Sequence, residues 1–183
     1  MITKKSVLVT GGAGGMGLAT AFKLSQNGFH VFVADTNMAM IKNIELNDAI
    51  TPLLMDVTDR KSIERAFNEV KSQTDSLAGI VNFAGILRVG SISEMPEEML
   101  SQLLDINVMG TYRVNQIFLP LLNTDSKGRI INVSSETGWQ SGGPFNGAYA
   151  MSKHAIEAYS DSLRRELMFL GISVIKLQPG PFK

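Results

Sequence analysis

Short runs of apolar and β-branched residues alternate along this chain with longer stretches in which apolar residues recur at helical spacing. Six short runs occur, over residues 6–10, 30–34, 51–55, 78–83, 129–134 and 172–177. Each run is continuously apolar instead of alternating with polar residues, which is typical of a strand buried on both faces. The pattern therefore predicts six buried strands.

Five stretches with helical spacing separate these strands. In one of them Ile63, Ala66, Phe67 and Val70 lie three or four residues apart, which places them on one helix face. Parallel strands need such crossovers, and the crossovers are right-handed. We therefore predict an α/β fold: a doubly wound, Rossmann-type parallel sheet of about six strands in order 3-2-1-4-5-6, with helices on both faces.

Length and composition fit one globular unit. The 183 residues are 44% hydrophobic and 19% charged, with a formal net charge of zero. A chain of this size builds one core, so we predict a single domain over residues 1–183. The neutral balance gives no electrostatic footprint for nucleic acid or an acidic membrane surface.

Cysteine is absent, which excludes disulfides and thiolate metal sites, and two histidines far apart in sequence give a metal little to bind. The N-terminus has no apolar run long enough for a signal peptide or a membrane span. We therefore predict a cytoplasmic protein with no metal, membrane or nucleic-acid partner.

The segment TGGAGGMG, residues 10–17, places five glycines in eight residues, directly after the first strand and at the start of a helix that ends at Gly28. Backbone without side chains can approach a pyrophosphate, and a helix N-terminus supplies free N–H donors. A tight turn without a ligand is the alternative, but it needs fewer glycines. Three registers fit dinucleotide fingerprints: Gly12, Gly14 and Gly17; Gly11, Gly14 and Gly17; or Gly11, Gly15 and Gly17.

Asp35 ends the second strand, eighteen residues beyond Gly17. An acid at this spacing accepts hydrogen bonds from an adenosine ribose and repels a 2′-phosphate. No Arg or Lys in residues 10–17 or 34–40 offsets that repulsion, so we predict NAD in preference to NADP. Asp35 could alternatively be a turn residue. Asp56 and Val57 follow the third strand, where adenine is expected, although Asp56 could equally cap a helix.

Tyr149 and Lys153 lie four residues apart in a predicted helix, which places phenol and ammonium on one face. A nearby cation stabilises a phenolate and lowers its pKa, so the pair can act as a general acid or base. Ser135 follows the fifth strand, on the edge of the sheet where the nucleotide is expected. Its hydroxyl can hydrogen-bond a substrate oxygen, or it can simply cap a loop.

Together these residues resemble the classical short-chain dehydrogenase/reductase family along the whole chain. The family's TGxxxGxG is matched by Thr10, Gly11, Gly15 and Gly17, with Met16 between the last two, and its NAG by Asn82, Ala84 and Gly85, with Phe83 inserted. The remaining matches are its catalytic asparagine, serine, tyrosine and lysine and the turn after strand six, at Asn107, Ser135, Tyr149, Lys153 and Pro179–Gly180.

The resemblance selects Gly11, Gly15 and Gly17 as the working register, with Gly12 and Gly14 as loop filler. It leads us to expect that Phe83 lengthens or bulges its turn. The segment from Tyr149 to Leu167 is most similar to the branch that holds retinol and 17β-hydroxysteroid dehydrogenases.

The resemblance implies an NAD-dependent oxidoreductase that interconverts a secondary alcohol and a ketone. Tyr149 would move the proton, Ser135 would polarise the substrate oxygen, Lys153 would hold the ribose and lower the Tyr149 pKa, and Asn107 would position a water. An isomerase or epimerase that returns the hydride to the same substrate is one alternative. A nucleotide-binding module without turnover is another, although it has no need of all four residues.

The resemblance also implies a small-molecule substrate and a homodimer or homotetramer, paired through helices over residues 96–122 and 148–170 with apolar faces. Family members usually continue beyond the last residues of this sequence into a seventh strand and a substrate lid. We therefore expect the chain as given to bind NAD and to turn over substrate poorly.

Overall fold

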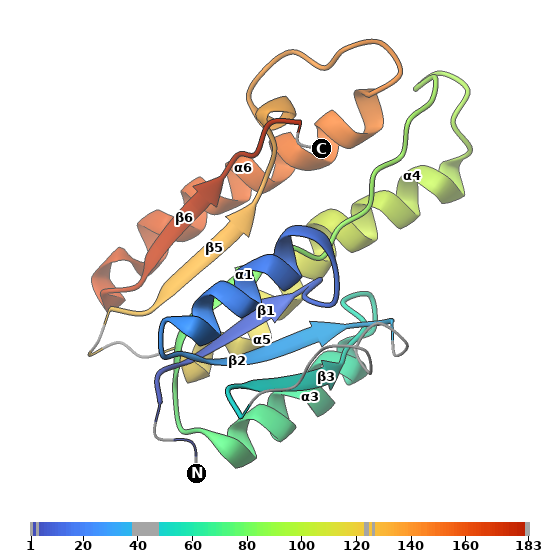
Figure 1. Ribbon diagram of the computed structural model, residues 1–183. Coiled ribbons are helices and arrows are strands. Elements are labelled where there is room, and N and C mark those ends of the chain that lie inside the picture. Colours follow the sequence, from blue (N-terminus) through green and yellow to red (C-terminus); the bar gives the residue numbers. More distant parts are fainter. Residues whose placement is uncertain (1, 3, 38–47, 123–124, 126, 182–183) are drawn as a thin grey trace.

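The computed structural model describes residues 2, 4–37, 48–122, 125 and 127–181. Its parallel strands form one sheet in the order β3-β2-β1-β4-β5-β6 (Figure 1), which confirms the predicted doubly wound topology. Their bounds are β1 Ser6–Thr10, β2 His30–Asp35, β3 Ile50–Leu54, β4 Leu77–Asn82, β5 Arg129–Val133 and β6 Ser173–Leu177.

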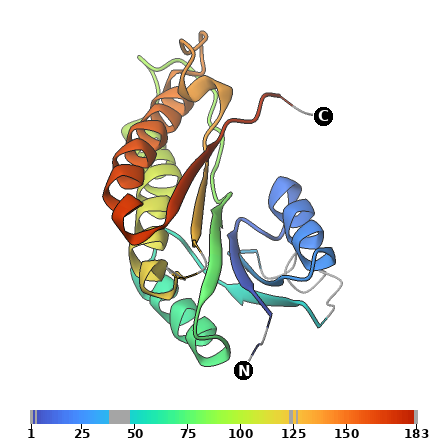
Figure 2. The same cartoon turned by 90° about the vertical axis from the view of Figure 1, so that its left-hand side faces the viewer.

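Helices cover both faces of the sheet. The helices are α1 (Gly15–Gln26), α3 (Arg60–Gln73), α4 (Glu97–Leu104), α5 (Thr111–Phe118) and α6 (Gly147–Leu167). Figure 2 shows α1 in blue on one side of the sheet, with the green, yellow and orange helices α3, α5 and α6 on the other. No helix in the described ranges is long and apolar enough to cross a bilayer.

The segment predicted as one helix over residues 96–122 is divided into four pieces. A π-helical turn, η1 (Asp105–Gly110), separates α4 from α5, and a 3-10 turn, η2 (Leu119–Leu121), ends the segment. Gly110 in the π turn packs against the loop after β3, because a Cβ there would lie 2.7 Å from Val57 Cγ2. The wide turn therefore carries Asn107 at a point where the helix meets a neighbouring loop closely.

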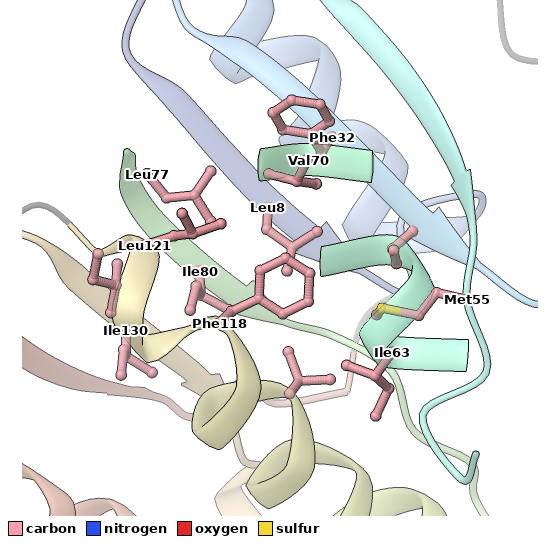
Figure 3. Close-up of a cluster of buried hydrophobic side chains, with 14 of the residues drawn as sticks. Leu8, Phe32, Met55, Ile63, Val70, Leu77, Ile80, Phe118, Leu121 and Ile130 are labelled. Atoms are coloured by element: carbon pink, nitrogen blue, oxygen red, sulfur yellow. The ribbon is translucent and has the colours of Figure 1, made fainter. Parts of the chain in front are cut away.

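The larger core lies between the sheet and the helices α3 and α5. Figure 3 shows Leu8 and Ile80 from the sheet beside Phe118 from α5, and Ile63 and Val70 from α3 complete the cluster. A smaller apolar cluster packs the opposite face of β1 and β2 against α1. Burial on both faces explains the continuously apolar runs of β1, β2 and β4. The same prediction is wrong for β6, because this edge strand leaves Ile175 and Leu177 exposed on one face.

A buried group of asparagines crosses from the sheet to α5 beside the larger core. The Asn82 Nδ2 donates to the Asn115 and Asn132 side-chain oxygens at 2.8 and 2.9 Å. Asn132 in turn donates to Ser160 of α6, and Asn115 donates to Tyr159. Because unpaired amides are costly inside a protein, this network fixes α5 and α6 against the ends of β4 and β5.

His30 at the start of β2 supports a pH-dependent prediction. Its ring is buried, its Nε2 lies 2.9 Å from Thr51 Oγ1, and burial, with the nearby charge of Lys4, lowers the pKa of His30 below 6.5. The unfolded chain therefore binds this proton more readily, so the free energy of unfolding should fall as the pH drops below about 6.5. Urea unfolding at pH 7.5 and 5.5 should show a smaller pH effect in His30→Gln.

The variant His154→Gln is the matched control, because His154 is exposed on α6. An equal pH effect in wild type and His30→Gln would contradict the role given to His30.

Candidate active site

Two clefts open at the carboxyl edge of the sheet, on either side of the glycine-rich loop. The Asp35 cleft, of about 910 Å³, is lined by residues after β2, β3 and β4, and the Tyr149 cleft, of about 530 Å³, by residues from the loops after β4, β5 and β6 and from α6. A smaller hollow of about 290 Å³ shares Gly11 and Asp35 with the first cleft and Met16 and Phe83 with the second. The three spaces together form one elongated site.

The three glycines of the predicted working register have two different reasons to lack a side chain. Gly11 has a φ of +62°, and a Cβ on it would lie 2.7 Å from the Ala84 backbone nitrogen, while a Cβ on Gly17 would overlap the Gly11 carbonyl oxygen. Gly15 also has a positive φ, +51°, but its missing side chain faces open space. Gly11 and Gly17 therefore allow the loop to pack, and Gly15 leaves the backbone exposed at the first residue of α1.

The interpretation of Gly12 as loop filler is wrong. A Cβ on Gly12 would lie 2.8 Å from Val33 Cγ1 and 2.9 Å from the Val9 carbonyl oxygen, so the loop needs glycine here to pack on β1 and β2. Gly14 is different, because it caps α1 in extended backbone that any residue adopts.

Asp35 holds the glycine-rich loop and faces a cleft at the same time. Its Oδ2 accepts a hydrogen bond from the Ala13 backbone at 3.2 Å, and its Oδ1 accepts from the Asn37 backbone at 3.0 Å. Asp56 and Val57 line the same cleft, as predicted from their place after β3.

Asp56 does not cap the following helix. Its Oδ1 accepts from the backbone and hydroxyl of Thr58 at 2.8 and 2.7 Å, whereas Asp59 caps α3 by accepting from the Lys61 backbone. The alternative of Asp56 as a helix cap is therefore wrong.

The loop after β4 runs directly alongside the end of β1. The Phe83 N–H donates to the Thr10 carbonyl oxygen at 3.1 Å, and the Ala84 N–H to the Thr10 hydroxyl at 3.2 Å. The first of these bonds completes the regular ladder, which ends at the pair Thr10–Asn82, and the irregular register lies at the other end of β1. Phe83 follows the strand without a bulge in the ladder, and its effect on the length of the turn stays a prediction.

The predicted cofactor residues of this loop divide between the site and the core. Ala84 and Gly85 line the Asp35 cleft, and Phe83 and Gly85 line the Tyr149 cleft. Asn82 lies 3% exposed in the asparagine network, and Thr10 is 1% exposed. Asn82 and Thr10 therefore support this loop from its buried side.

Asn107 holds the segment between the two clefts. Its side-chain oxygen accepts from the Ile86 N–H at 2.8 Å, and its Nδ2 donates to the Ile86 carbonyl oxygen and to Ser152 Oγ at 2.9 and 3.1 Å. Ile86 lines both clefts. The contacts of Asn107 in the structure are therefore to the chain that shapes the site.

Ser135, Tyr149 and Lys153 line one cleft together with Pro179 and Gly180. The Lys153 ammonium is buried, donates to the Val133 carbonyl oxygen at 2.8 Å, and lies over the Tyr149 ring, 5.5 Å from its centroid. The helical spacing of four residues thus places phenol and ammonium on one face, as the sequence predicts.

Burial dominates the ionisation of this pair. It raises the pKa of the Tyr149 phenol, against a smaller lowering by a hydrogen bond with Ser135. Burial also lowers the pKa of Lys153 to about 8. The expected lowering of the Tyr149 pKa by Lys153 is not seen, because the ammonium lies over the ring and donates to Val133.

Two buried residues of α6 that the sequence analysis did not single out support this site. Ser152 donates to the Tyr149 carbonyl oxygen at 2.7 Å and accepts from Asn107. Glu157, one turn after Lys153, accepts from Gln178 at 2.9 Å. The sequence does contain a signal for Glu157. It is an acidic residue four positions after Lys153, which places it on the same buried face of the helix. His154 is exposed, and the described residues contain no cluster of three potential metal-binding groups.

The buried Lys153 supports a prediction on stability. Its pKa, lowered from 10.5 to about 8, implies a desolvation cost of roughly 3 kcal/mol at neutral pH. Lys153→Met should therefore raise the free energy of unfolding by about 1–3 kcal/mol at pH 7, after the lost hydrogen bond to Val133 is allowed for.

The pH dependence gives this prediction its sign. Between pH 8 and 10.5 the unfolded chain keeps the lysine proton and the folded chain does not, so wild type should gain stability and approach Lys153→Met. Denaturant unfolding across this range measures the difference, with the exposed Lys61→Met as control. A less stable Lys153→Met at pH 7 would contradict the account.

Comparison with known proteins places the chain in a family. The family model described as short chain dehydrogenase matches residues 5–183. Over its full length the chain is 37% identical to the uncharacterized oxidoreductase YbbO of Escherichia coli, covering 67% of that protein. Over 98% of its length it is 36% identical to human retinol dehydrogenase 16, covering 57% of that protein.

A solved structure described as ElxO with NADP bound superposes on 99% of this chain and 75% of its own, with a TM-score of 0.92 and 28% identity. Fold, site geometry and sequence therefore agree: the chain belongs to the short-chain dehydrogenase/reductase family.

Proposed function

We propose that this chain forms the site of an NAD-dependent oxidoreductase that interconverts a secondary alcohol and a ketone on a small molecule. The observation that carries the proposal is the gathering of Ser135, Tyr149 and Lys153 in one cleft, which a glycine-lined hollow joins to the Asp35 cleft. An elongated ligand can lie along this route with one end at Asp35 and the other at Tyr149.

The residues present fit a nicotinamide dinucleotide. The N-terminus of α1 has no side-chain cap and no acidic residue in its first turn, so its N–H donors suit a pyrophosphate. Gly15 leaves open space beside them. Asp35 suits a ribose. Among the described residues the Lys153 ammonium donates to the Val133 carbonyl alone, so two of its three N–H groups are available to a ligand.

The dinucleotide, when bound, supplies the hydride donor or acceptor for the reaction. The chain supplies the proton and the position of the substrate. Tyr149 holds the proton at its phenolic oxygen, since burial keeps the phenol neutral. Ser135 donates a hydrogen bond to the substrate oxygen beside it. Lys153 can bind the cofactor ribose and, from that position, stabilise a developing phenolate.

The charge of the Asp35 cleft supports NAD over NADP. Its described lining residues include the carboxylates of Asp35, Asp56 and Asp105 and no cation, and the Asp105 charge is already paired with Arg113 at 2.7 Å. A 2′-phosphate beside Asp35 would therefore meet a carboxylate that no lining base offsets. The likeness to a structure with NADP bound keeps the opposite preference as an outcome of the test.

Assembly and location remain predictions. A homodimer or homotetramer would cover exposed apolar side chains on η1, α5 and α6, among them Met109, Tyr112 and Met151. The cytoplasmic location rests on the sequence features given above.

Asp35→Ala tests the cofactor preference. Because the substitution removes the charge that repels a 2′-phosphate, it should narrow the ratio of NADP to NAD dissociation constants by about tenfold or more. Fluorescence titration with NADH and NADPH measures this ratio. Glu98→Ala is the control, because it removes one exposed acid from α4, outside the residues that line the cleft. Tighter NADPH binding in wild type would contradict the preference.

Tyr149→Phe tests the reaction. It should lower turnover by about 10²–10⁴-fold and leave the affinity for NADH within twofold, because it removes a proton carrier and little cofactor surface. Tyr112→Phe, exposed on α5, is the matched control. A panel of steroids, retinoids, polyols and 3-oxoacyl thioesters, each with NAD(H) and NADP(H), supplies the substrate.

Two outcomes would refute the proposal. Unchanged turnover in Tyr149→Phe would remove the proposed acid and base. Conversion of a substrate without net NADH or NAD accumulation would favour an isomerase or epimerase.

A further inference from the structure

Glu157 is a buried carboxylate one helical turn beyond Lys153, and the proposed reaction does not use it. It is 9% exposed. Its Oε2 pairs with the Lys176 ammonium of β6 at 2.9 Å, and its Oε1 accepts from Gln178 Nε2 at 2.9 Å. The Ser134 hydroxyl forms a further hydrogen bond with this carboxylate, and these partners together hold the pKa of Glu157 below its ordinary value despite burial.

Two of the three partners of Glu157 connect it to the Tyr149 cleft. Ser134 lines this cleft beside Ser135, and Gln178 comes directly before the Pro179–Gly180 turn. Backbone hydrogen bonds extend these links, because the Glu136 N–H donates to the Pro179 carbonyl oxygen at 3.1 Å. One carboxylate thus joins α6, the loop after β5 and the loop after β6.

The position of Glu157 leaves little freedom in this arrangement. A Cβ on Gly138 would lie 3.2 Å from Glu157 Cγ, so the loop after Ser135 packs directly on this side chain. The Ser134 hydroxyl also lies 3.4 Å from the Lys153 carbonyl oxygen. A rotation of Glu157 would therefore break the link between the loop after β6 and α6, and it would leave the loop after β5 with only the weaker contact between Ser134 and the Lys153 carbonyl.

Asp161 offers a contrast within the same ion-pair group. Its carboxylate contacts the same ammonium, with its two oxygens 2.9 and 3.0 Å from Lys176 Nζ, but its side chain is 45% exposed. It forms ion pairs with Lys176 and Arg164, neither of which lines the Tyr149 cleft. Two carboxylates thus compensate the charge of Lys176. Of these two, only Glu157 also contacts segments that line the Tyr149 cleft.

We propose that Glu157 is a positioning residue for the nicotinamide end of the site: through Ser134 and Gln178 it fixes Ser135 and the Pro179–Gly180 turn relative to Tyr149 and Lys153. The proposal rests on the proposed dinucleotide site. Its specific consequence is that the nicotinamide ring depends on Glu157, whereas the adenosine, the pyrophosphate and both riboses do not.

The test compares two ligands that differ only in the nicotinamide ring. NADH and ADP-ribose share every other group, so the ratio of their dissociation constants isolates the contribution of the ring. NADPH and 2′-phospho-ADP-ribose form the second pair, which makes the test independent of cofactor preference. Calorimetry on the whole chain measures all four constants without a substrate.

Glu157→Leu removes all three links and should weaken NADH about tenfold while ADP-ribose stays within twofold. Glu157→Gln keeps an acceptor for Gln178, so it should fall between Glu157→Leu and wild type. Asp161→Leu, the matched control, should leave the ratio unchanged. Gln178→Leu breaks the same link from its other end and should repeat the effect if Glu157→Leu fails to fold.

The outcomes are distinguishable. Equal weakening of NADH and ADP-ribose, or no weakening of either, would overturn the positioning role of Glu157. A shift in the ratio for Asp161→Leu as large as that for Glu157→Leu would assign the effect to the charge of Lys176 instead. A wild-type chain that binds none of the four ligands would refute the proposed function itself, and this inference with it.

Discussion

The close approach of two backbones, those of the loops after β1 and β4, is the constraint on which the rest of the site depends. β1 pairs with β2 on one side and β4 on the other, so the chain direction of the crossovers reverses here. Thr10 binds the following loop through its carbonyl and its hydroxyl, and Gly11 admits it without a side chain. Because this contact lies between them, the spaces at the carboxyl ends of the strands form two clefts instead of one.

The two ends of the site differ in whether their charged side chains are exposed to water or buried. The Asp35 cleft gathers carboxylates at its surface, where water screens them. In the Tyr149 cleft an ammonium is buried with one carbonyl partner, which lowers the stability of the fold. A strained or poorly solvated group kept at a site is a common sign that a ligand completes its environment. The glycines between the Asp35 cleft and the Tyr149 cleft carry no charge, so they affect only the distance between these two ends of the site.

Sequence pattern predicted the architecture well because the central strands β1, β2 and β4 are buried on both faces, so hydrophobic runs and strands coincide almost residue for residue. The edge strand β6 has one exposed face, yet its apolar run still marks it as a strand. The spacing of Tyr149 and Lys153 was equally reliable, since helical geometry alone sets it. Contacts between segments were harder. That Gly12 packs on Val33 and that Asn82 turns into the core depend on which strands are neighbours, and a local pattern does not contain that information.

Other differences between prediction and structure arose because a resemblance to a sequence motif specifies residue types and not backbone conformation. The extra residue Phe83 indicated a lengthened or bulged turn, yet the β1–β4 ladder before it is regular up to its last hydrogen bond, from Phe83 to Thr10. Ionisation was also beyond reach, because the pKa values of Tyr149 and Lys153 depend on burial at a depth that the sequence does not give. The sequence shows that residue 157 is a glutamate, but it does not show that this side chain is buried.

The π turn at residues 105–110 has a consequence for how this segment can change in length. An α-helix turns by about 100° per residue, and a π turn holds one residue more than a regular turn does. Loss of a single residue there would restore regular α geometry and leave α5 in the same rotation about its axis, with Val114 and Phe118 still in the core. A one-codon deletion in the π turn is therefore a local event, whereas the same deletion within α5 would rotate the side chains that follow by about 100° and reach the centre of the protein.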